Sequence, residues 1–529
     1  MDAKEILRFC IERGILLDKE VLKLIEGIGD LDSIKIFLEK IKDSTSSTII
    51  TRNLFEQNTQ KVNEFFFNLP KENQEKLEKL RIKLGLSIEI SKEIPKIETT
   101  TEKKILNLEG ENLGNLQVDP IKISIGRKLE VSDFVKHFRN RFLSVKSVLQ
   151  DHSELDNLVS INKISGNRQG ISIIGIVYDK KVTKNKNILL GAEDFSGKIR
   201  VLINQNKKDL YKKAEDIALD SVIGFKGSGN SEIFFVNDIV FPESRLFERK
   251  NSPVEEYALF TGDIHFGSKK FLEKSFLKFI DYLNGKLPNT PEVSKIKYLF
   301  LVGDIVTGIG NYPNQERDLK INDLESQFEG LADLLDRIRK DIKIVISPGN
   351  HDGVRLMEPQ PPLNKRYAWP LYNLKNVILT TNPAKINIGK QESFKGFDIL
   401  TYHGFSFNFF ANNIPKLAIE KAVNSPEKIM KFILKNRHLA PTHGSAQYFP
   451  SEEDMHFIDP IPDIFFTGHL HKSAVSYYNN ILMISSSCWE GFTPYQEKFG
   501  NEPDHCKVPM LNLKTRAIKI LDFEENEGN

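Results

Sequence analysis

Five apolar runs after residue 250 each end in a side chain that is a candidate metal ligand. Short apolar runs are typical of strands buried in a sheet, and amphipathic stretches at 271–283 and 327–342 predict helices between them. Polar groups at the carboxyl ends of strands in open α/β sheets gather along one rim, so these side chains are expected to meet in space. The runs are YALFTGDIH (257–265), KYLFLVGD (297–304), KIVISPGNH (343–351), FDILTYH (397–403) and PDIFFTGHLH (462–471). They predict a layered α/β domain over residues 249–529.

The residue types at these strand ends favour two divalent cations. They supply carboxylate or amide oxygen and imidazole nitrogen, without a thiolate, which suits Mn, Fe or Zn. The seven candidates are Asp263, His265, Asp304, Asn350, His403, His469 and His471. Asp263/His265 and His469/His471 are spaced i, i+2, so on an extended segment both members of a pair point to the same side. A carboxylate such as Asp304 would bridge two cations roughly 3.5 to 4 Å apart, the arrangement for in-line displacement at phosphorus.

Length and composition set the outer limits. A chain of 529 residues exceeds what one hydrophobic core usually serves, so several domains are expected. No stretch approaches the roughly 20 uncharged apolar residues of a membrane helix, and the N-terminus lacks the features of a secretion signal. Only three cysteines are present, too few for a disulfide framework, which fits a reducing, cytoplasmic setting. The net charge of +2 neither demands nor excludes a polyanionic partner.

The first 125 residues divide into two parts. Residues 1–45 are predicted to form a small helical docking domain, because their apolar residues are spaced to give one buried stripe per helix. These residues are Ile6, Leu7, Cys10, Ile11, Leu16, Leu17, Val21, Leu22 and Ile25. Residues 46–125 are polar and charged with weak or no periodicity, and are predicted to be a charged flexible linker.

Residues 126–248 are predicted to form a helix followed by a small barrel. Ser132 is a candidate N-cap of the helix, and one face carries Phe134, Phe138, Phe142, Val145 and Leu149. From about residue 160 short β-rich runs alternate with Gly, Asn and Lys turns, which suggests a barrel such as an OB-fold. Its aromatic residues would either stack on nucleic-acid bases or belong to the core or to a protein interface. They are Phe195, Phe225, Phe234 and Phe235.

The strand-end motifs, taken in order, are improbable by chance. GDIHFG, GDIVTG, GNHD, YHG and GHLH resemble the motif set of the calcineurin-like metallophosphoesterases. The resemblance implies that Asp263, His265, Asp304 and His471 serve one metal ion, and that Asp304, Asn350, His403 and His469 serve the other, with Asp304 as the bridge. It also implies that His351 contacts the scissile phosphate and assists the leaving oxygen, while Asp352 orients His351. Thr307 departs from the pattern, because related sequences often carry an acid there.

Three further segments narrow the resemblance. GNHDGVRLMEPQPPL (349–363), HLAPTHGSAQYFPSEED (438–454) and DPIPDIFFTGHLH (459–471) resemble the small-subunit family of archaeal family-D DNA polymerases, over most of residues 125–510. The order of helix, barrel and phosphoesterase also resembles the accessory B-subunits of eukaryotic replicative polymerases. Those relatives have generally lost their metal ligands, whereas every ligand position is filled here.

The resemblance implies a two-metal 3′→5′ exonuclease that hydrolyses DNA phosphodiester bonds as proofreading in DNA replication. It implies a heterodimer with the large catalytic polymerase subunit, DNA 3′ ends as substrate and two divalent metal ions, with Mn favoured over Fe, Zn or Mg. Two alternatives stay open: a catalytically weak scaffold subunit, and a stand-alone repair nuclease or phosphodiesterase. The EPQPPL and PSEED segments speak against the second, since minimal chemistry does not require them. Also open are the roles of His438 and His443, in the substrate path or in structure, and whether residues 1–45 bind a polymerase partner or a sliding clamp.

Overall fold

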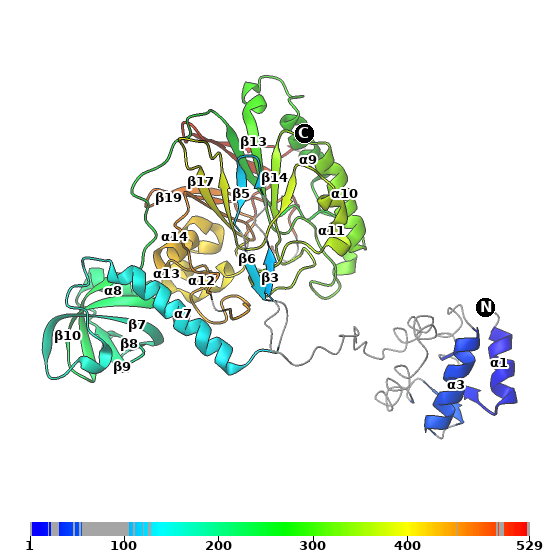
Figure 1. Ribbon diagram of the computed structural model, residues 1–529, viewed down its shortest axis with the longest axis horizontal. Coiled ribbons are helices and arrows are strands. Elements are labelled where there is room, and N and C mark those ends of the chain that lie inside the picture. Colours follow the sequence, from blue (N-terminus) through cyan, green and yellow to red (C-terminus); the bar gives the residue numbers. More distant parts are fainter. Residues whose placement is uncertain are drawn as a thin grey trace. The chain divides into compact units, whose positions relative to one another are not determined.

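The computed structural model describes residues 3–18, 21–22, 31–45, 48–51, 54, 105–108, 112–119, 121–124, 128–451, 453–493, 496 and 502–525. The chain divides into two compact units, Met1–Glu102 and Lys103–Asn529. Most of the described residues belong to the second unit, which carries every strand end singled out above (Figure 1). In the described part of the chain no helix combines the length and apolar character needed to cross a bilayer.

The first unit contains helices α1 (Ala3–Glu12) and α3 (Leu31–Thr45) and the paired two-residue strands β1 (Leu16–Leu17) and β2 (Ile49–Ile50). Its core includes Ile6, Cys10 and Val21, as the spacing predicts. The predicted buried stripe is wrong at Leu7, Ile11 and Leu16, which are exposed. The helix α1 is short, and only one narrow face meets α3 and the strands. The predicted core residue Ile25 lies outside the described residues.

The range predicted as a linker, 46–125, contains strands where the structure describes it. Besides β2 these are β3 (Ile105–Leu108), β4 (Asn112–Leu113), β5 (Leu116–Val118) and β6 (Ile121–Ser124). Strand β5 pairs antiparallel with β16 (Ala384–Ile388), more than 260 residues later. Leu116 is fully buried in the core between the two sheets described below. A strand this short has too few residues for periodicity to identify it, and its partner strand supplies its hydrogen bonds.

Helix α7 (Val131–Gln150) begins two residues earlier than an N-cap at Ser132 predicts. The N-cap is Glu130, in a capping box with Asp133, and the backbone N–H of Glu130 donates to Asp133 Oδ2 at 2.9 Å. On the predicted apolar face Phe142, Val145 and Leu149 are buried against the barrel that follows.

A closed five-stranded barrel follows, in the order β10-β11-β9-β8-β7, as the spacing of short strands predicts. Its strands are β7 (Arg168–Val182), β8 (Ile188–Glu193), β9 (Lys198–Ile203), β10 (Val222–Gly229) and β11 (Ile233–Val240), with α8 (Lys208–Glu215) between β9 and β10. Phe225 and Phe234 fill the barrel core, whereas Phe195 and Phe235 are exposed. Phe225 and Phe234 therefore have the core role, and Phe195 and Phe235 are left for a nucleic-acid base or a protein interface.

The remainder is a sandwich of two sheets with helices outside both (Figure 1). The six-stranded sheet has the order β15-β14-β13-β12-β21-β22 and the seven-stranded sheet the order β19-β20-β18-β17-β16-β5-β4. The first sheet comprises β12 (Tyr257–Thr261), β13 (Ile296–Val302), β14 (Lys343–Ser347), β15 (Val377–Leu379), β21 (Lys507–Asn512) and β22 (Ile518–Asp522). The second adds β17 (Phe397–Tyr402), β18 (Ile464–Thr467), β19 (Ala474–Tyr478) and β20 (Ile481–Ser485) to β4, β5 and β16. All five strands predicted to carry ligands are present.

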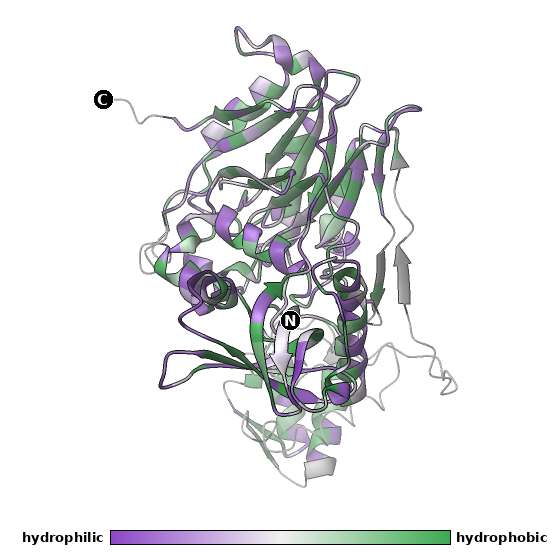
Figure 2. Cartoon of the chain, turned by 90° about the vertical axis from the view of Figure 1, so that its left-hand side faces the viewer, coloured by the Kyte–Doolittle hydropathy of each residue, from purple (hydrophilic) through white to green (hydrophobic). Residues whose placement is uncertain are grey.

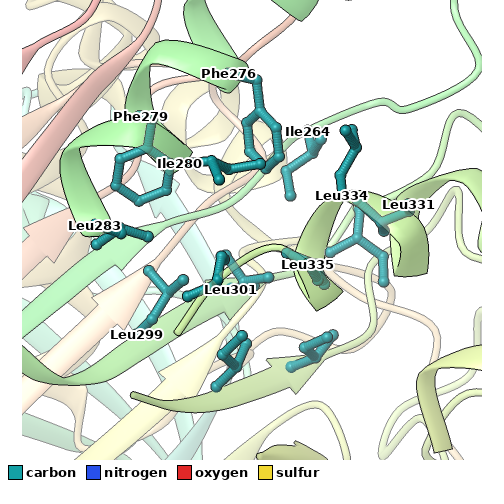
Figure 3. Packing of buried hydrophobic residues seen from close by; sticks show 14 of the residues in the cluster. Ile264, Phe276, Phe279, Ile280, Leu283, Leu299, Leu301, Leu331, Leu334 and Leu335 are labelled. Carbon is teal, nitrogen blue, oxygen red and sulfur yellow. The ribbon is translucent and has the colours of Figure 1, made fainter. Parts of the chain in front are cut away.

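Helices cover the outer face of each sheet. Helices α9 (Glu273–Leu283), α10 (Leu324–Asp336) and α11 (Lys365–Tyr372) pack on the first sheet, and α12 (Phe407–Asn413), α13 (Pro415–Ile419) and α14 (Pro426–Asn436) on the second. Figure 3 shows Phe276 and Phe279 of α9 and Leu335 of α10 packed around Leu299 and Leu301 of β13. The predicted helices at 271–283 and 327–342 are confirmed, although α10 begins earlier, at Leu324 after its N-cap Asp323, and ends at Asp336.

Between the sheets, Phe260 of β12 stacks on Phe300 of β13 at 5.2 Å and meets Phe466 of β18 edge-on at 5.1 Å. Strands that face helices on one side and a second sheet on the other read as continuous apolar runs, which is the pattern of the five predicted strands. Their predominantly hydrophobic colouring is visible in Figure 2. This packing fixes the two sheets face to face and brings their carboxyl edges together.

A buried ion pair joins α7 to the sandwich. Arg141 Nε donates to Asp454 Oδ2 at 2.6 Å, and Arg141 Nη1 donates to the carbonyl oxygen of Pro441 at 2.6 Å. His438 Nε2 lies 2.9 Å from the same Asp454 oxygen, and His438 Nδ1 accepts the backbone N–H of Ala440. His438 is buried, so of its two open roles the structural one is supported. The PSEED segment thus supplies the carboxylate that holds α7, and the barrel packed on it, against the sandwich.

Replacing Arg141 with alanine is expected to destabilise the folded chain by about 3–5 kcal/mol, because Asp454 would be buried without its cation. The matched control is Arg139→Ala, which removes an exposed arginine from the same helix and should cost within about 0.5 kcal/mol. Urea unfolding of both variants provides the measurement. Equal losses of unfolding free energy would contradict a stabilising role for the pair.

The stability of this region is expected to fall in acid. Burial, and then the neighbouring Arg141 cation, lower the pKa of His438 to about 3 from its ordinary 6.5. Below pH 6.5 the unfolded chain binds a proton that the folded His438 does not, so the unfolding free energy falls by up to about 1.4 kcal/mol per pH unit toward pH 3. His438→Gln should flatten this slope, and His152→Gln, at a partly exposed histidine, should not. Unfolding measured between pH 6.5 and 5 in EDTA tests this, and identical slopes would contradict it.

Candidate metal centre

Two clusters of candidate ligands lie where the carboxyl edges of the two sheets meet. In the first, Asp263 and His265 follow β12 of the first sheet and His471 follows β18 of the second. His265 Nε2 lies 3.1 Å from His471 Nε2, and His471 Nε2 lies 3.6 Å from Asp263 Oδ1. All three side chains are at most slightly exposed. Three donor atoms on two different sheets therefore converge on one point.

The second cluster also draws on both sheets. Asp304 follows β13 in the first sheet, while His403 and His469 follow β17 and β18 in the second. His403 Nε2 lies 3.2 Å from Asp304 Oδ2 and 3.2 Å from His469 Nδ1. Asn350, after β14, places its Oδ1 3.0 Å from the same His403 nitrogen. The structure thus brings all seven predicted ligands into two adjacent groups.

The backbone holds five of these residues in the left-handed region. The φ angles are 47° at Asp263, 50° at His265, 47° at Asp304, 73° at His469 and 56° at His471. The i, i+2 pairs are therefore not on extended segments, and that part of the sequence reasoning is wrong. Each such residue costs about 1–2 kcal/mol, and strain of this kind concentrates at functional sites. In the first pair Ile264, between the two ligands, is buried under α9 and α10 (Figure 3).

Glycines precede four of the strand-end ligands because the site leaves no room for a side chain. At Gly303 φ is +70°, and an added Cβ would lie 2.2 Å from His403 Nδ1. At Gly349 an added Cβ would lie 2.3 Å from Asp304 Oδ1. The glycines of the motifs thus allow ligands from neighbouring strands to approach one another.

Surrounding groups orient the ligands. His403 Nδ1 lies 3.3 Å from the carbonyl oxygen of Val302, so an Nδ1–H there leaves the Nε2 lone pair for a cation. Asp263 accepts hydrogen bonds from the backbone N–H of His469 and from Ser486 Oγ at 2.9 Å. The fully buried Trp489 donates from its backbone N–H to the Asp263 carbonyl oxygen. These contacts fix the direction in which each ligand points.

The charges of the cluster follow from its burial. Burial lowers the pKa values of His265, His469 and His471 to about 3, so these imidazoles are neutral and able to bind a cation. Burial raises the pKa of Asp263 to about 8. Burial lowers the pKa of His403, but the Asp304 carboxylate outweighs it and raises that pKa to about 10. A proton held between His403 and Asp304 marks the position where positive charge is favoured.

His351 and Asp352 lie at the edge of the clusters. The His351 ring meets the His265 ring edge-on at 5.0 Å, and its backbone N–H donates to Asp304 Oδ1 at 2.7 Å. His351 Nδ1 lies 2.9 Å from the carbonyl oxygen of Thr307, which leaves Nε2 for a substrate. Asp352 accepts the backbone N–H groups of Val306 and Gly349. Asp352 therefore shapes the loop that carries His351, and no contact joins it to the His351 ring among the described hydrogen bonds.

Several contacting residues escaped the sequence reasoning. Gln496 Nε2 lies 2.9 Å from His471 Nδ1, Asn408 Nδ2 lies 3.2 Å from His469 Nε2, and Asn311 Nδ2 lies 3.1 Å from His351 Nδ1. They lie outside the five motifs, Asn408 at the start of α12, so no strand-end pattern points to them. Cys488 is buried, and burial raises the pKa of its thiol well above the ordinary range.

The donor set fits divalent cations. Both clusters offer carboxylate and imidazole donors, the second adds an amide oxygen, and no thiolate takes part. Nitrogen atoms of neighbouring histidines lie only 3.1–3.2 Å apart, the arrangement expected of ligands that share a cation.

Fold and site together define an α/β sandwich protein with a two-cluster candidate metal centre. The family model that describes the B subunits of DNA polymerases alpha and epsilon matches residues 258–476. The DNA polymerase II small subunit of Pyrococcus furiosus is 35% identical over 423 residues, which cover 77% of this chain and 67% of that protein. The corresponding subunit of Methanothermobacter thermautotrophicus is 35% identical over 398 residues, or 74% of this chain and 80% of that protein. The chain belongs to the DNA polymerase II small-subunit family, the small subunits of archaeal family-D DNA polymerase.

Among solved structures, an archaeal phosphodiesterase aligns with 50% of this chain and 98% of its own length, at 12% identity and a TM-score of 0.26. A Zn²⁺ complex of Vps29 from Entamoeba histolytica covers 51% of this chain at 14% identity and a TM-score of 0.21. Similarities this weak carry no argument about the site.

Gly303→Ala is expected to weaken binding at the second cluster, because its methyl group would displace His403. Gly389→Ala is the matched control: its φ is +71°, against +70° at Gly303, and no atom lies within 4 Å of the added Cβ. Both variants should lose about 1 kcal/mol of stability from the left-handed backbone. Titration with Mn²⁺ should show one weakened site in Gly303→Ala alone. Equal metal binding by the two variants would contradict the packing argument.

Proposed function

We propose that the chain is a two-metal 3′→5′ exonuclease of the calcineurin-like metallophosphoesterase type, acting on DNA 3′ ends as the proofreading subunit of the polymerase. The observation that carries the proposal is the pair of adjacent clusters, each built from both sheets, with His351 beside them. A scaffold has no need of seven converging ligands, five of them in strained backbone. The resemblance of the five strand-end motifs to those of the calcineurin-like metallophosphoesterases supports the same proposal.

In the proposed site Asp263, His265, Asp304 and His471 hold one cation, and Asp304, Asn350, His403 and His469 hold the other. When bound, two such cations lower the pKa of water and neutralise charge on the phosphate. Mn²⁺ is the favoured ion, with Fe, Zn and Mg as alternatives.

The chain's own residues then position and protonate the substrate. His351 Nε2 would face the phosphate while Nδ1–H is donated to the Thr307 carbonyl oxygen, and a proton carried on Nε2 would pass to the departing 3′ oxygen. The short backbone contact from His351 to Asp304 Oδ1 ties this acid to a proposed ligand. Buried, neutral imidazoles and strand-fixed carboxylates provide a preorganised, largely dry site.

The name of the related small subunits implies a large partner, and we propose that this chain forms a heterodimer with the large polymerase subunit. The order of the barrel strands, with a helix between β9 and β10, supports an OB-fold. Exposed Phe235 and Phe195 are available to a base or to a partner protein, and buried Phe225 and Phe234 are not. Residues 1–45 remain proposed as a docking domain, consistent with their separate core.

Asp304→Ala and His351→Ala are expected to abolish exonuclease activity. Asp304→Ala removes a shared ligand, and His351→Ala removes the acid, which lowers the rate by about 10²–10⁴-fold. The control is Asp333→Ala, which removes an exposed carboxylate on α10. Stepwise shortening of a 3′-end primer is measured with Mn²⁺ and with EDTA, with and without the large subunit.

Loss of activity in both site variants and in EDTA supports the proposal, and undiminished activity in both variants contradicts the mechanism. A wild-type chain that neither binds Mn²⁺ nor cleaves would instead support the scaffold alternative.

A further inference from the structure

The EPQPPL segment (358–363), which the proposed chemistry does not use, lies directly behind the second cluster. Its Gln360 is buried, and so is Asn382, which lies on the connection from β15 of the first sheet to β16 of the second. The two residues pair through their backbones: Gln360 N donates to the Asn382 carbonyl oxygen at 2.7 Å, and Asn382 N donates to the Gln360 carbonyl oxygen at 3.1 Å. This two-residue bridge stands apart from both sheets.

The side chains of the pair contact segments that follow strands of both sheets. Asn382 Nδ2 donates to Gln360 Oε1 at 2.7 Å, so the two amides are joined. Gln360 Nε2 donates to the Gly349 carbonyl oxygen at 3.0 Å and to the Arg355 carbonyl oxygen at 3.1 Å. Asn382 Oδ1 accepts the backbone N–H of His403 at 2.8 Å. Each amide oxygen and nitrogen of the pair thus has a partner, as expected of a rigid buried network.

These contacts end at two proposed ligands of the same cation. Gly349 immediately precedes Asn350 at the end of β14, and the backbone N–H held by Asn382 belongs to His403 itself, at the end of β17. Asn350 Oδ1 and His403 Nε2 are 3.0 Å apart. Since β14 and β17 belong to different sheets, no ladder hydrogen bond sets that separation. The amide pair is a polar connection between the segments that follow these two strands.

A second residue of the segment braces the other side of His403. Glu358 Oε2 accepts the Tyr402 hydroxyl at 3.4 Å and lies 2.7 Å from His456 Nε2. Tyr402 is the residue before His403, and its hydroxyl also accepts the backbone N–H of Ser406. Two residues of the EPQPPL segment therefore help to hold His403. Gln360 acts through Asn382 on the backbone N–H of His403, and Glu358 acts on the side chain of Tyr402.

We infer that Gln360 and Asn382 are positioning residues, a cross-sheet amide clasp that sets the distance between Asn350 and His403 and thereby the affinity of the second cluster for its cation. The role of the cation rests on the proposed function, whereas the clasp itself rests on the hydrogen bonds alone. Contacts of this kind behind a ligand change metal affinity by about 10–100-fold when they are lost.

Gln360→Glu tests the clasp with almost no change of volume. A carboxylate oxygen in place of Nε2 would face the carbonyl oxygens of Gly349 and Arg355, so two donated hydrogen bonds are lost. Asn376→Asp is the matched control: this amide is also buried and donates to the Ile342 carbonyl oxygen at 2.9 Å, at the opposite end of β14 from the ligands. Both variants lose a buried donor, so both should unfold at lower temperature, and only Gln360→Glu should affect the metal.

The measurement is a Mn²⁺ titration of the full chain, with unfolding temperature and primer shortening recorded in parallel. Asn376→Asp should bind two ions with the same affinities as the wild type. Gln360→Glu should bind one ion with wild-type affinity and the other about 10–100-fold more weakly. Should the carboxylate prevent folding, Gln360→Met, which keeps the length without a charge, and Asn382→Asp, which retains the His403 contact, provide the same readout.

Two ions bound with wild-type affinity by the folded clasp variants would overturn the inference while leaving the proposed function in place. Weakened binding in Asn376→Asp as well would also overturn it, because general loss of stability would then explain the effect. Fewer than two ions in the wild type would instead count against the proposed function.

Discussion

His403 Nε2 lies within 3.2 Å of an oxygen of Asp304, an oxygen of Asn350 and a nitrogen of His469, and those residues come from both sheets. The rest of the site depends on this convergence of ligand atoms. Ligand atoms from separate sheets keep a fixed spacing only if the two sheets are rigidly packed against each other. Phe260, which stacks on Phe300 and meets Phe466 edge-on, provides that packing a short way below the rim. Glycines at the strand ends then let the edges close to ligand distance.

Strong local signals made the centre predictable from sequence. Five apolar runs, each ending in a donor, needed only the rule that strand carboxyl ends gather on one rim, and the structure places all seven donors there. The metal assignment of each donor stays a prediction. The i, i+2 spacing predicts the right neighbours for a wrong reason, since Asp263 and His265 have left-handed rather than extended backbone. Dihedral angles of that kind are imposed by the surrounding packing and leave no periodic trace.

What escaped prediction depends on long-range partners. Strand β5 exists because β16 supplies its hydrogen bonds, and its own few residues resemble a linker. The Arg141–Asp454 pair joins residues 313 apart, and the clasp joins Gln360 to Asn382. A sequence shows that EPQPPL and PSEED are unusual, but only the fold shows that one lies behind His403 and the other anchors α7. Buried polar residues in loops are where sequence patterns give the least information.

The central claim is that the two clusters each hold a cation. A crystal structure of the chain grown with Mn²⁺, with anomalous diffraction data at the manganese edge, tests it most directly. The account predicts two anomalous peaks, one among Asp263, His265 and His471 and the other among Asp304, Asn350, His403 and His469. A single peak that lies outside both groups of residues, or no peak at either cluster with Mn²⁺ in excess, would contradict it.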